Sequence, residues 1–136
     1  IKETSMTNRV KEFSKEVVGR LSDATTDHLL NKHASDKCLI TSGTLSFLVK
    51  EISNELGIDD YFGTEAEVKD GSYTGKVFGH PNFSEEKVRR IKGWIADQSF
   101  ELIYAYSDSI HDLPLLEFSD CEHPPAKVKI IISNGI

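Results

Sequence analysis

The stretch ELIYAYSDSIHDLPLLE, residues 101–117, joins a short apolar run to two aspartates that lie four residues apart. Its first half is typical of a buried strand and its second half of a short helix. Asp108 and Asp112 lie at the junction between the two. Two interpretations are open at this point. Either Asp112 caps the helix, or the two carboxylates form part of a metal site.

Length and composition limit the class of protein. The chain has 136 residues, which corresponds to about one domain, and its hydrophobic share of 38% and charged share of 28% are typical of globular proteins. The formal charge of −6 argues against a nucleic-acid partner, because such partners usually require a basic surface. A small phosphorylated partner remains compatible, since one basic residue or a metal ion can dominate a local site.

The cysteines and the apolar runs bear on location. Cys38 and Cys121 show no paired spacing, so we expect no disulfide framework and predict a cytoplasmic protein. No apolar run approaches the roughly 18 residues that span a bilayer, so we expect no transmembrane segment. Four histidines show no metal-ligand spacing and are expected at the surface or as capping residues: His28, His33, His80 and His123. The oligomeric state is left open.

Apolar spacing and turn residues predict the order of helices and strands. The expected elements are helices within 8–30, a strand at 38–40, a helix over 45–56 ending at Gly57, a hairpin over 64–79 turning at Asp70 and Gly71, a helix over 82–98 with Ser84 as N-cap, a strand over 101–107 and a short helix over 111–119. Strands that alternate with helices predict an α/β fold with a parallel sheet. Ligands bind at the carboxyl ends of such strands, where the polar clusters TSGT (41–44) and SDSIHD (107–112) fall.

These clusters carry chemistry that suits a phosphate and a metal. Carboxylates on a strand-to-helix turn are ligands that Mg²⁺ prefers, and a divalent cation would offset the repulsion between Asp108 and Asp112. Ser42, Gly43 and Thr44 offer a hydroxyl, a close backbone approach and N–H groups at an expected helix start, which together make a phosphate cradle. The alternative for these three residues is a simple capping turn.

A lysine completes the pattern. Lys87 falls in the first turn of its expected helix, where the helix dipole does not favour a cation. A solvent-facing side chain is the usual explanation for a single lysine. The interpretation therefore depends on the order of the three elements along the chain rather than on any one of them.

That order resembles the haloacid dehalogenase superfamily of phosphohydrolases, and its detail is most similar to the phosphoserine-phosphatase-like branch, subfamily IB. The segments that carry the resemblance are LITSGT (39–44), the hairpin EVKDGSYTGKV (67–77), EEKVRRIKGW (85–94) and YSDSIHDLPLLE (106–117). The resemblance covers roughly residues 36–124. It implies a Rossmann-like α/β core with a parallel sheet over residues 34–136, and it makes residues 1–33 the tail of a helical cap.

The resemblance also implies roles for residues at the two strand ends. Ser42 would hydrogen-bond the transferring phosphoryl oxygen, with the Gly43 N–H beside it and Thr44 in the same substrate-binding turn. Lys87 would neutralise phosphate charge and help to hold the attacking carboxylate. Such roles agree with phosphoryl transfer, which depends on positioning and electrostatic stabilisation.

The metal site would come from the second cluster. Asp108 would bind Mg²⁺ directly, and Asp112 would support the metal directly or through water. His111 occupies a position that is commonly Asn in this branch. A histidine there could contact the substrate and would make the site sensitive to pH near neutrality, or it could simply face solvent at the helix start. The implied catalytic set is Ser42, Lys87, Asp108 and Asp112.

The Asp-x-Asp motif of the family, which supplies the nucleophile and the general acid/base, does not occur in these 136 residues. In the family its strand is central, and deleting it would leave backbone groups unpaired within the sheet. We therefore expect the first core strand to lie outside this sequence, with a second missing stretch near Pro125. The expected function is a Mg²⁺-dependent phosphatase that hydrolyses a small phosphomonoester through an aspartyl-phosphate intermediate. Alternatives are a non-catalytic phosphate-binding or regulatory protein without that motif, and a purely structural α/β module.

Overall fold

The computed structural model describes residues 1–21, 24–96, 102–107, 110–119 and 128–133, with residues 20, 21, 24–26, 102 and 128–133 described through their backbone alone. Its elements, in chain order, are α1 (Glu3–Leu21), α2 (Ala24–Lys32), β1 (Lys37–Leu45), α3 (Ser46–Leu56), β2 (Asp60–Thr64), β3 (Ala66–Lys69), β4 (Ser72–Val77), α4 (Glu85–Ile95), β5 (Leu102–Tyr106), a 3₁₀ turn (Ile110–Asp112), α5 (Leu113–Phe118) and β6 (Val128–Ser133). The expected alternation of strands and helices is confirmed.

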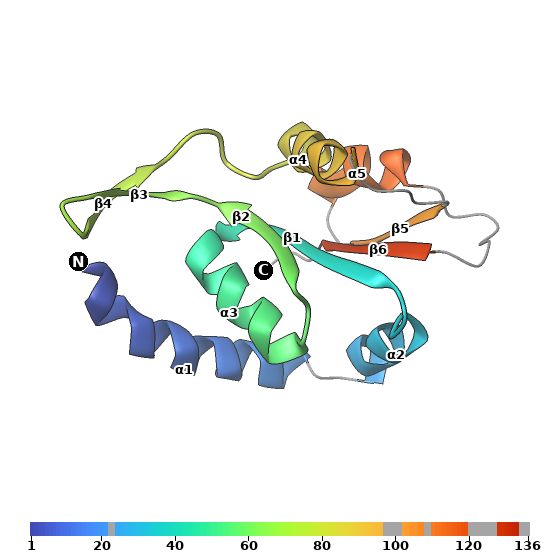
Figure 1. Ribbon diagram of the computed structural model, residues 1–136, viewed down its shortest axis with the longest axis horizontal. Coiled ribbons are helices and arrows are strands. Elements are labelled where there is room, and N and C mark those ends of the chain that lie inside the picture. Colours follow the sequence, from blue (N-terminus) through green and yellow to red (C-terminus); the bar gives the residue numbers. More distant parts are fainter. Residues whose placement is uncertain (22–23, 97–101, 108–109, 120–127, 134–136) are drawn as a thin grey trace.

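Four of the strands form one parallel sheet in the order β2-β1-β6-β5 (Figure 1). Because every pair is parallel, the carboxyl ends of the strands meet at one edge. The pairing of Thr41 with Phe62 on one side and with Ser133 on the other defines this edge at β1. The expected parallel sheet is therefore confirmed, and the two polar clusters of the sequence follow β1 and β5.

The central place between β1 and β5 belongs to β6. Ile130 pairs with Cys38 on one side and with Tyr104 on the other. The sequence analysis expected the motif-bearing strand of the family, which is central there, to lie outside the 136 residues. That expectation stays a prediction, while in the sheet described here β6 occupies the central place. The segment VKIIIS of β6 was not assigned as a strand, although a run of valine and isoleucine suits a strand covered on both faces.

Helices cover both faces of the sheet. Leu39 of β1 packs with Ile91 of α4 and Leu115 of α5, whereas the next residue, Ile40, packs with Val49 of α3 on the other side. Successive residues of a strand point to opposite faces, which places α4 and α5 on one side and α3 on the other (Figure 1). The helix expected over 82–98 is confirmed as α4, and its Ile91 is fully buried.

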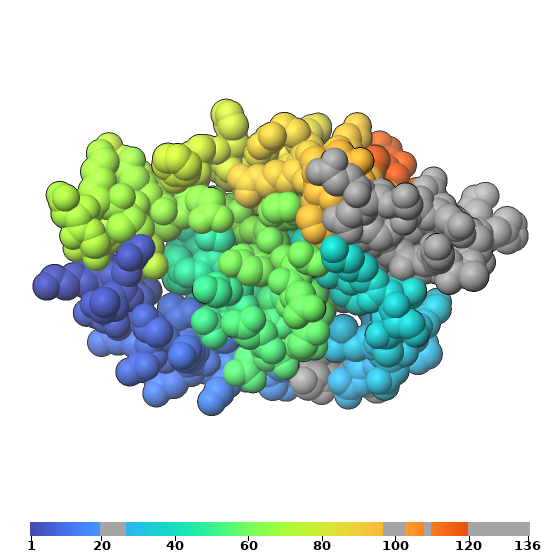
Figure 2. All heavy atoms as spheres, viewed as in Figure 1, coloured from blue at the N-terminus to red at the C-terminus, as the bar shows by residue number. Residues whose placement is uncertain are grey.

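The hairpin β3–β4 projects from one end of the sheet. Its turn residues, Asp70 and Gly71, have φ values of 49° and 71°, as a tight turn requires. The N-terminal segment pairs with it, because the Tyr73 N–H donates to the carbonyl of Ile1 at 2.9 Å and the Glu3 N–H donates to that of Gly71 at 3.2 Å. Figure 2 shows this contact at one end of the molecule, and α1 continues along α3 (Figure 1).

Two local expectations are wrong. Ser84 precedes α4 but makes no side-chain cap hydrogen bond, and its φ of 49° lies in the left-handed region. His33 is 3% exposed rather than at the surface, and its ring nitrogens lie 2.8 Å from Asp36 Oδ2 and 3.1 Å from the Tyr106 hydroxyl.

The structure also adds the strand β2, which the sequence analysis did not assign. Within the described ranges, no helix combines the length and the apolar character that a membrane span requires.

Candidate active site

The candidate site lies at the carboxyl edge of the sheet, where β1 and β5 end. Lys87 Nζ donates a hydrogen bond to Asp112 Oδ1 at 2.7 Å, and their side chains are 6% and 2% exposed. The Ser107 hydroxyl donates to the other oxygen, Asp112 Oδ2, at 2.6 Å. Lys87 comes from the first turn of α4, Asp112 from the 3₁₀ turn before α5, and Ser107 from the position directly after β5. Three separate segments therefore meet at one buried carboxylate.

This geometry decides between the alternatives for Asp112 and Lys87. Asp112 stands at the N-cap position of α5 but makes no side-chain cap bond, so the capping interpretation is wrong. Lys87 is buried, so its interpretation as a surface lysine is also wrong. A buried ion pair costs desolvation and is weak evidence for stability, which directs attention to a role for its charges. Asp108 lies outside the described residues.

The donor set at Asp112 fits a hard cation. Each carboxylate oxygen has two lone-pair sites, so a carboxylate can accept a hydrogen bond from a water ligand of an ion in addition to bonds from protein groups. Mg²⁺ commonly retains several waters and takes one or two carboxylates. Asp112 would therefore support the ion, with Asp108 as the expected direct ligand. Among the side chains that the structure describes, no group of three or more His, Cys, Asp or Glu could by itself hold a metal.

The second part of the site is the turn at the end of β1. Ser42 is 1% exposed, and its Oγ accepts a hydrogen bond from the Thr44 N–H at 3.1 Å. The pairing of β1 with β2 is irregular between Thr41 and Leu45, and α3 begins only at Ser46. The cradle thus lies in an irregular strand end rather than at the expected helix start, and it does not cap α3 through a side chain. Irregular strand ends of this kind recur beside active sites, where they redirect side chains.

Gly43 permits a close aromatic contact. A Cβ at this position would lie 2.6 Å from Phe83 Cε2, closer than any side-chain contact allows. The Phe83 ring in turn lies 6.4 Å from the ring of His111, edge to face. His111 itself is exposed in the middle of the 3₁₀ turn. Phe83 therefore connects the cradle to the second cluster, and the proposed role of His111 in substrate binding remains a prediction.

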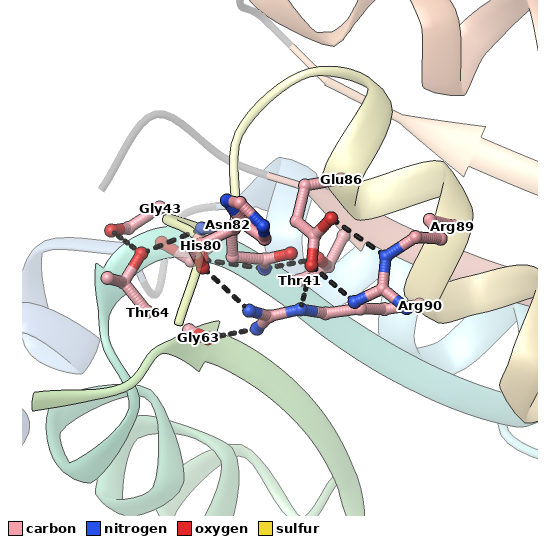
Figure 3. Close-up of polar contacts among 10 residues, drawn as sticks. Thr41, Gly43, Gly63, Thr64, His80, Asn82, Glu86, Arg89 and Arg90 are labelled. Carbon is pink, nitrogen blue, oxygen red and sulfur yellow. Dashed lines mark hydrogen bonds and ion pairs between the residues drawn. The ribbon is translucent and has the colours of Figure 1, made fainter. Parts of the chain in front are cut away.

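The loop before α4 carries polar residues that the sequence analysis missed (Figure 3). Asn82 is fully buried, and its Nδ2 donates to Thr41 Oγ1 at 2.9 Å and to the Ser42 carbonyl at 2.8 Å. The Thr64 hydroxyl donates to the Gly43 carbonyl at 2.7 Å and accepts from the Asn82 N–H at 3.0 Å. No sequence pattern predicts such contacts, because they join residues about 20 to 40 positions apart.

Arg90 fixes the same loop to the end of β2. Its guanidinium donates to the carbonyls of Gly63 at 2.6 Å and His80 at 2.8 Å, and to Glu86 Oε1 at 3.1 Å (Figure 3). Glu86 also accepts two hydrogen bonds from Arg89, at 2.8 and 2.6 Å. The hydrogen bonds from Arg89 above all lower the pKa of Glu86 from 4.5 to about 2. Burial opposes this shift, whereas the hydrogen bond from Arg90 and the charges of both guanidinium groups add to it. The α4 helix that carries Lys87 is thereby attached to β2.

The ion pairs of Glu86 with Arg89 and Arg90 predict that the stability of the protein depends on pH. The lowered pKa of Glu86 means that its contribution is present at pH values above about 4.5 and is lost as the pH falls towards 2. We expect Glu86→Gln to lower the free energy of unfolding at pH 7 by up to about 1 kcal/mol, since the pair is partly exposed. Urea unfolding at pH 7, 5, 4 and 3 should show this difference narrowing below pH 5. Glu55→Gln, an exposed position on α3, is the control, and a difference that stays constant down to pH 3 would contradict the prediction.

The fold and the site together define an α/β protein with a polar site at the carboxyl edge of a parallel sheet. The chain belongs to the haloacid dehalogenase-like hydrolases, since the model of that family matches residues 6–117. The resemblance stated from the sequence is therefore confirmed.

Individual relatives agree with this family. The chain is 39% identical over 89 residues to a histidinol-phosphatase of Neisseria meningitidis, covering 61% of this chain and 40% of that protein. It is 34% identical over 80 residues to a phosphoserine phosphatase of Streptococcus thermophilus, covering 57% of this chain and 37% of that protein. A crystal structure of a protein of unknown function from Bordetella pertussis superposes with a TM-score of 0.71 and 31% identity, covering 86% of this chain and 56% of that one. The chain thus spans between about a third and just over half of the length of these relatives.

Proposed function

We propose that the protein is a Mg²⁺-dependent phosphatase of a small phosphomonoester, acting through an aspartyl-phosphate intermediate. The observation that carries this proposal is the buried pair of Lys87 and Asp112, whose atoms lie 2.7 Å apart beside the end of β5. A lysine and a carboxylate buried together at the ligand-binding edge of an α/β sheet suit a site that handles the charge of a phosphoryl group and a metal ion. The names of the two curated relatives, histidinol-phosphatase and phosphoserine phosphatase, support the same class of substrate.

In this proposal the residues of the chain bind and orient the phosphoryl group. The Ser42 hydroxyl and the Gly43 N–H donate hydrogen bonds to its oxygens, and Thr44 holds the Ser42 hydroxyl in place. Lys87 stabilises the charge that develops on the group during transfer. The ion, held by Asp108 with support from Asp112, would supply electrostatic stabilisation of the phosphoryl oxygens. Residues 1–33 belong to a cap over this site and residues 34–136 to the core.

The attacking aspartate would come from residues outside these 136, since the sequence contains no Asp-x-Asp. The lengths of the relatives, which this chain spans only in part, are compatible with that origin. On this proposal a strand that carries the motif would take the central place beside β1. The first carboxylate would attack the phosphorus while the alcohol leaves, and water would then release inorganic phosphate from the carboxylate.

One observation favours a second candidate, a phosphate-binding protein without turnover. In the part of the chain that the structure describes, β6 already fills the central place between β1 and β5, and its last residue, Ser133, pairs with Thr41. A sheet with β6 in this place has the cradle and the Lys87–Asp112 pair, but its central strand carries no carboxylate nucleophile. Mg²⁺-dependent binding of inorganic phosphate without hydrolysis would favour this candidate.

Removal of the metal tests the proposal directly. We expect the complete protein to hydrolyse p-nitrophenyl phosphate in the presence of Mg²⁺, and EDTA to lower the rate at least about a hundredfold, because the ion stabilises the transferring group by several kcal/mol. Excess Mg²⁺ should restore the rate. Phosphoserine and histidinol phosphate, assayed by release of inorganic phosphate, would then identify the preferred substrate. Hydrolysis at an unchanged rate in EDTA would contradict the proposal.

A further inference from the structure

The cradle residues lie past the regular pairing of β1. The register with β6 extends to Thr41 and Ser133, and the register with β2 is interrupted between Thr41 and Leu45. The carbonyl groups of Ser42 and Gly43 are instead held by side chains from other segments. Asn82 Nδ2 donates to the Ser42 carbonyl at 2.8 Å, and the Thr64 hydroxyl donates to the Gly43 carbonyl at 2.7 Å.

Because the peptide bond is planar, these two contacts fix the direction of the backbone N–H groups in the cradle. In a trans peptide the C=O of one residue and the N–H of the next point in opposite directions within one plane. Asn82, by holding the Ser42 carbonyl, therefore fixes the direction of the Gly43 N–H. Thr64, by holding the Gly43 carbonyl, fixes the direction of the Thr44 N–H, and that group donates to Ser42 Oγ at 3.1 Å.

The two side chains are also connected to each other and to α4. The Asn82 N–H donates to Thr64 Oγ1 at 3.0 Å, so the Thr64 hydroxyl links the loop before α4 to the end of β1 (Figure 3). Both residues are buried, with Asn82 at 0% and Thr64 at 4% exposure. Lys87 follows Asn82 by only five residues, which ties the position of the cradle to that of the lysine.

The chemistry of Asn82 indicates why an amide occupies this position. Its Nδ2 makes two hydrogen bonds, while its Oδ1 is buried without a hydrogen-bond partner among the described residues. A buried acceptor without a partner is costly, and the two hydrogen bonds donated by Nδ2 offset that cost. Asn82 thus acts as a hydrogen-bond donor. Its amide holds the Ser42 carbonyl, which belongs to the same peptide group as the Gly43 N–H proposed to bind phosphate.

We propose that Thr64 and Asn82 are positioning residues of the phosphate cradle. They orient the Gly43 N–H and the Ser42 hydroxyl towards the phosphoryl oxygens without touching the substrate themselves. This inference rests on the proposed function, because it assigns these two groups to phosphate binding. It goes beyond that function by naming two side chains that contact neither metal nor phosphate and yet set the affinity of the site.

The test uses near-isosteric variants of the complete protein. Thr64→Val keeps the shape but removes the hydroxyl, and Asn82→Asp keeps the shape but turns an oxygen towards the Ser42 carbonyl. We expect both variants to lower phosphate affinity and kcat by about ten- to a hundredfold, since displacement of a binding group by about 1 Å has an effect of that size. Thr64→Ser retains the hydroxyl, so its phosphate affinity and kcat should stay within about threefold of those of the original protein.

Local readouts separate positioning from loss of stability. The amide resonances of Gly43 and Thr44 are followed while inorganic phosphate is added in the presence of Mg²⁺, and the melting temperature is measured for every variant. Ser53→Ala is the matched control, because Ser53 is fully buried and donates to the Ile58 carbonyl in a different part of the fold. This variant should melt at a lower temperature but bind phosphate as tightly as the original protein.

The outcomes distinguish the two proposals. If the protein hydrolyses phosphomonoesters but Thr64→Val and Asn82→Asp bind phosphate and turn over as before, the positioning role is wrong and the proposed function stands. If the protein binds phosphate at Gly43 without turnover, the phosphatase proposal fails, while a loss of affinity in the two variants still supports positioning. Gly43 and Thr44 resonances that do not respond to phosphate would overturn the positioning role.

Discussion

Lys87→Met is expected to lower kcat for phosphomonoester hydrolysis by at least about a thousandfold and the free energy of unfolding by about 3 kcal/mol. The loss of turnover follows from the removal of the charge that stabilises the phosphoryl group. The loss of stability follows from the burial of the pair, since the Asp112 carboxylate is 2% exposed and would lose a charged partner 2.7 Å away. Steady-state kinetics and urea unfolding measure the two effects separately.

Two further variants complete this experiment. Lys50→Met changes an exposed lysine on α3 and should leave both quantities close to those of the original protein. The double variant Lys87→Met/Asp112→Leu should recover much of the lost stability, because an apolar pair avoids the unpaired buried charge, yet it should remain inactive. Turnover in Lys87→Met at the rate of the original protein would show that Lys87 does not act on the phosphoryl group.

Asp108→Asn is expected to abolish hydrolysis supported by Mg²⁺, with a loss of about a thousandfold or more, because the residue is the proposed direct ligand of the ion. Asparagine retains the shape and one oxygen but loses the charge that binds the cation. Without metal the free energy of unfolding should stay constant or rise slightly, since one of two neighbouring negative charges is removed. This behaviour differs from that of Lys87→Met, which should lose stability as well as activity.

The metal itself provides the readout for Asp108. Binding of Mn²⁺, followed by electron paramagnetic resonance, should weaken in Asp108→Asn in parallel with the rise in the Mg²⁺ concentration needed for half-maximal activity. Asp59→Asn changes an exposed aspartate after α3 and serves as the control. Unaltered Mn²⁺ affinity in Asp108→Asn would exclude the residue as a ligand, whatever the activity of the variant.

The sequence alone determined the class of fold and the family. The apolar run of β1 and the amphipathic patterns of α3 and α4 are local properties, because side-chain spacing follows from the geometry of one strand or one helix. The turn at Asp70 and Gly71 is equally local, since a tight hairpin needs left-handed backbone at its centre. The order of the polar clusters along the chain was sufficient to recognise the haloacid dehalogenase-like hydrolases, which the family comparison confirms.

The tertiary structure alone decided which residues meet at the carboxyl edge of the sheet. The contact of Lys87 with Asp112 joins positions 25 residues apart, and that of Asn82 with the Ser42 carbonyl joins positions 40 apart. Periodicity carries no information about such contacts, because they depend on how strands pair and helices pack. For the same reason the place of β6 between β1 and β5 could not be predicted, since its apolar run would suit any buried position in a parallel sheet.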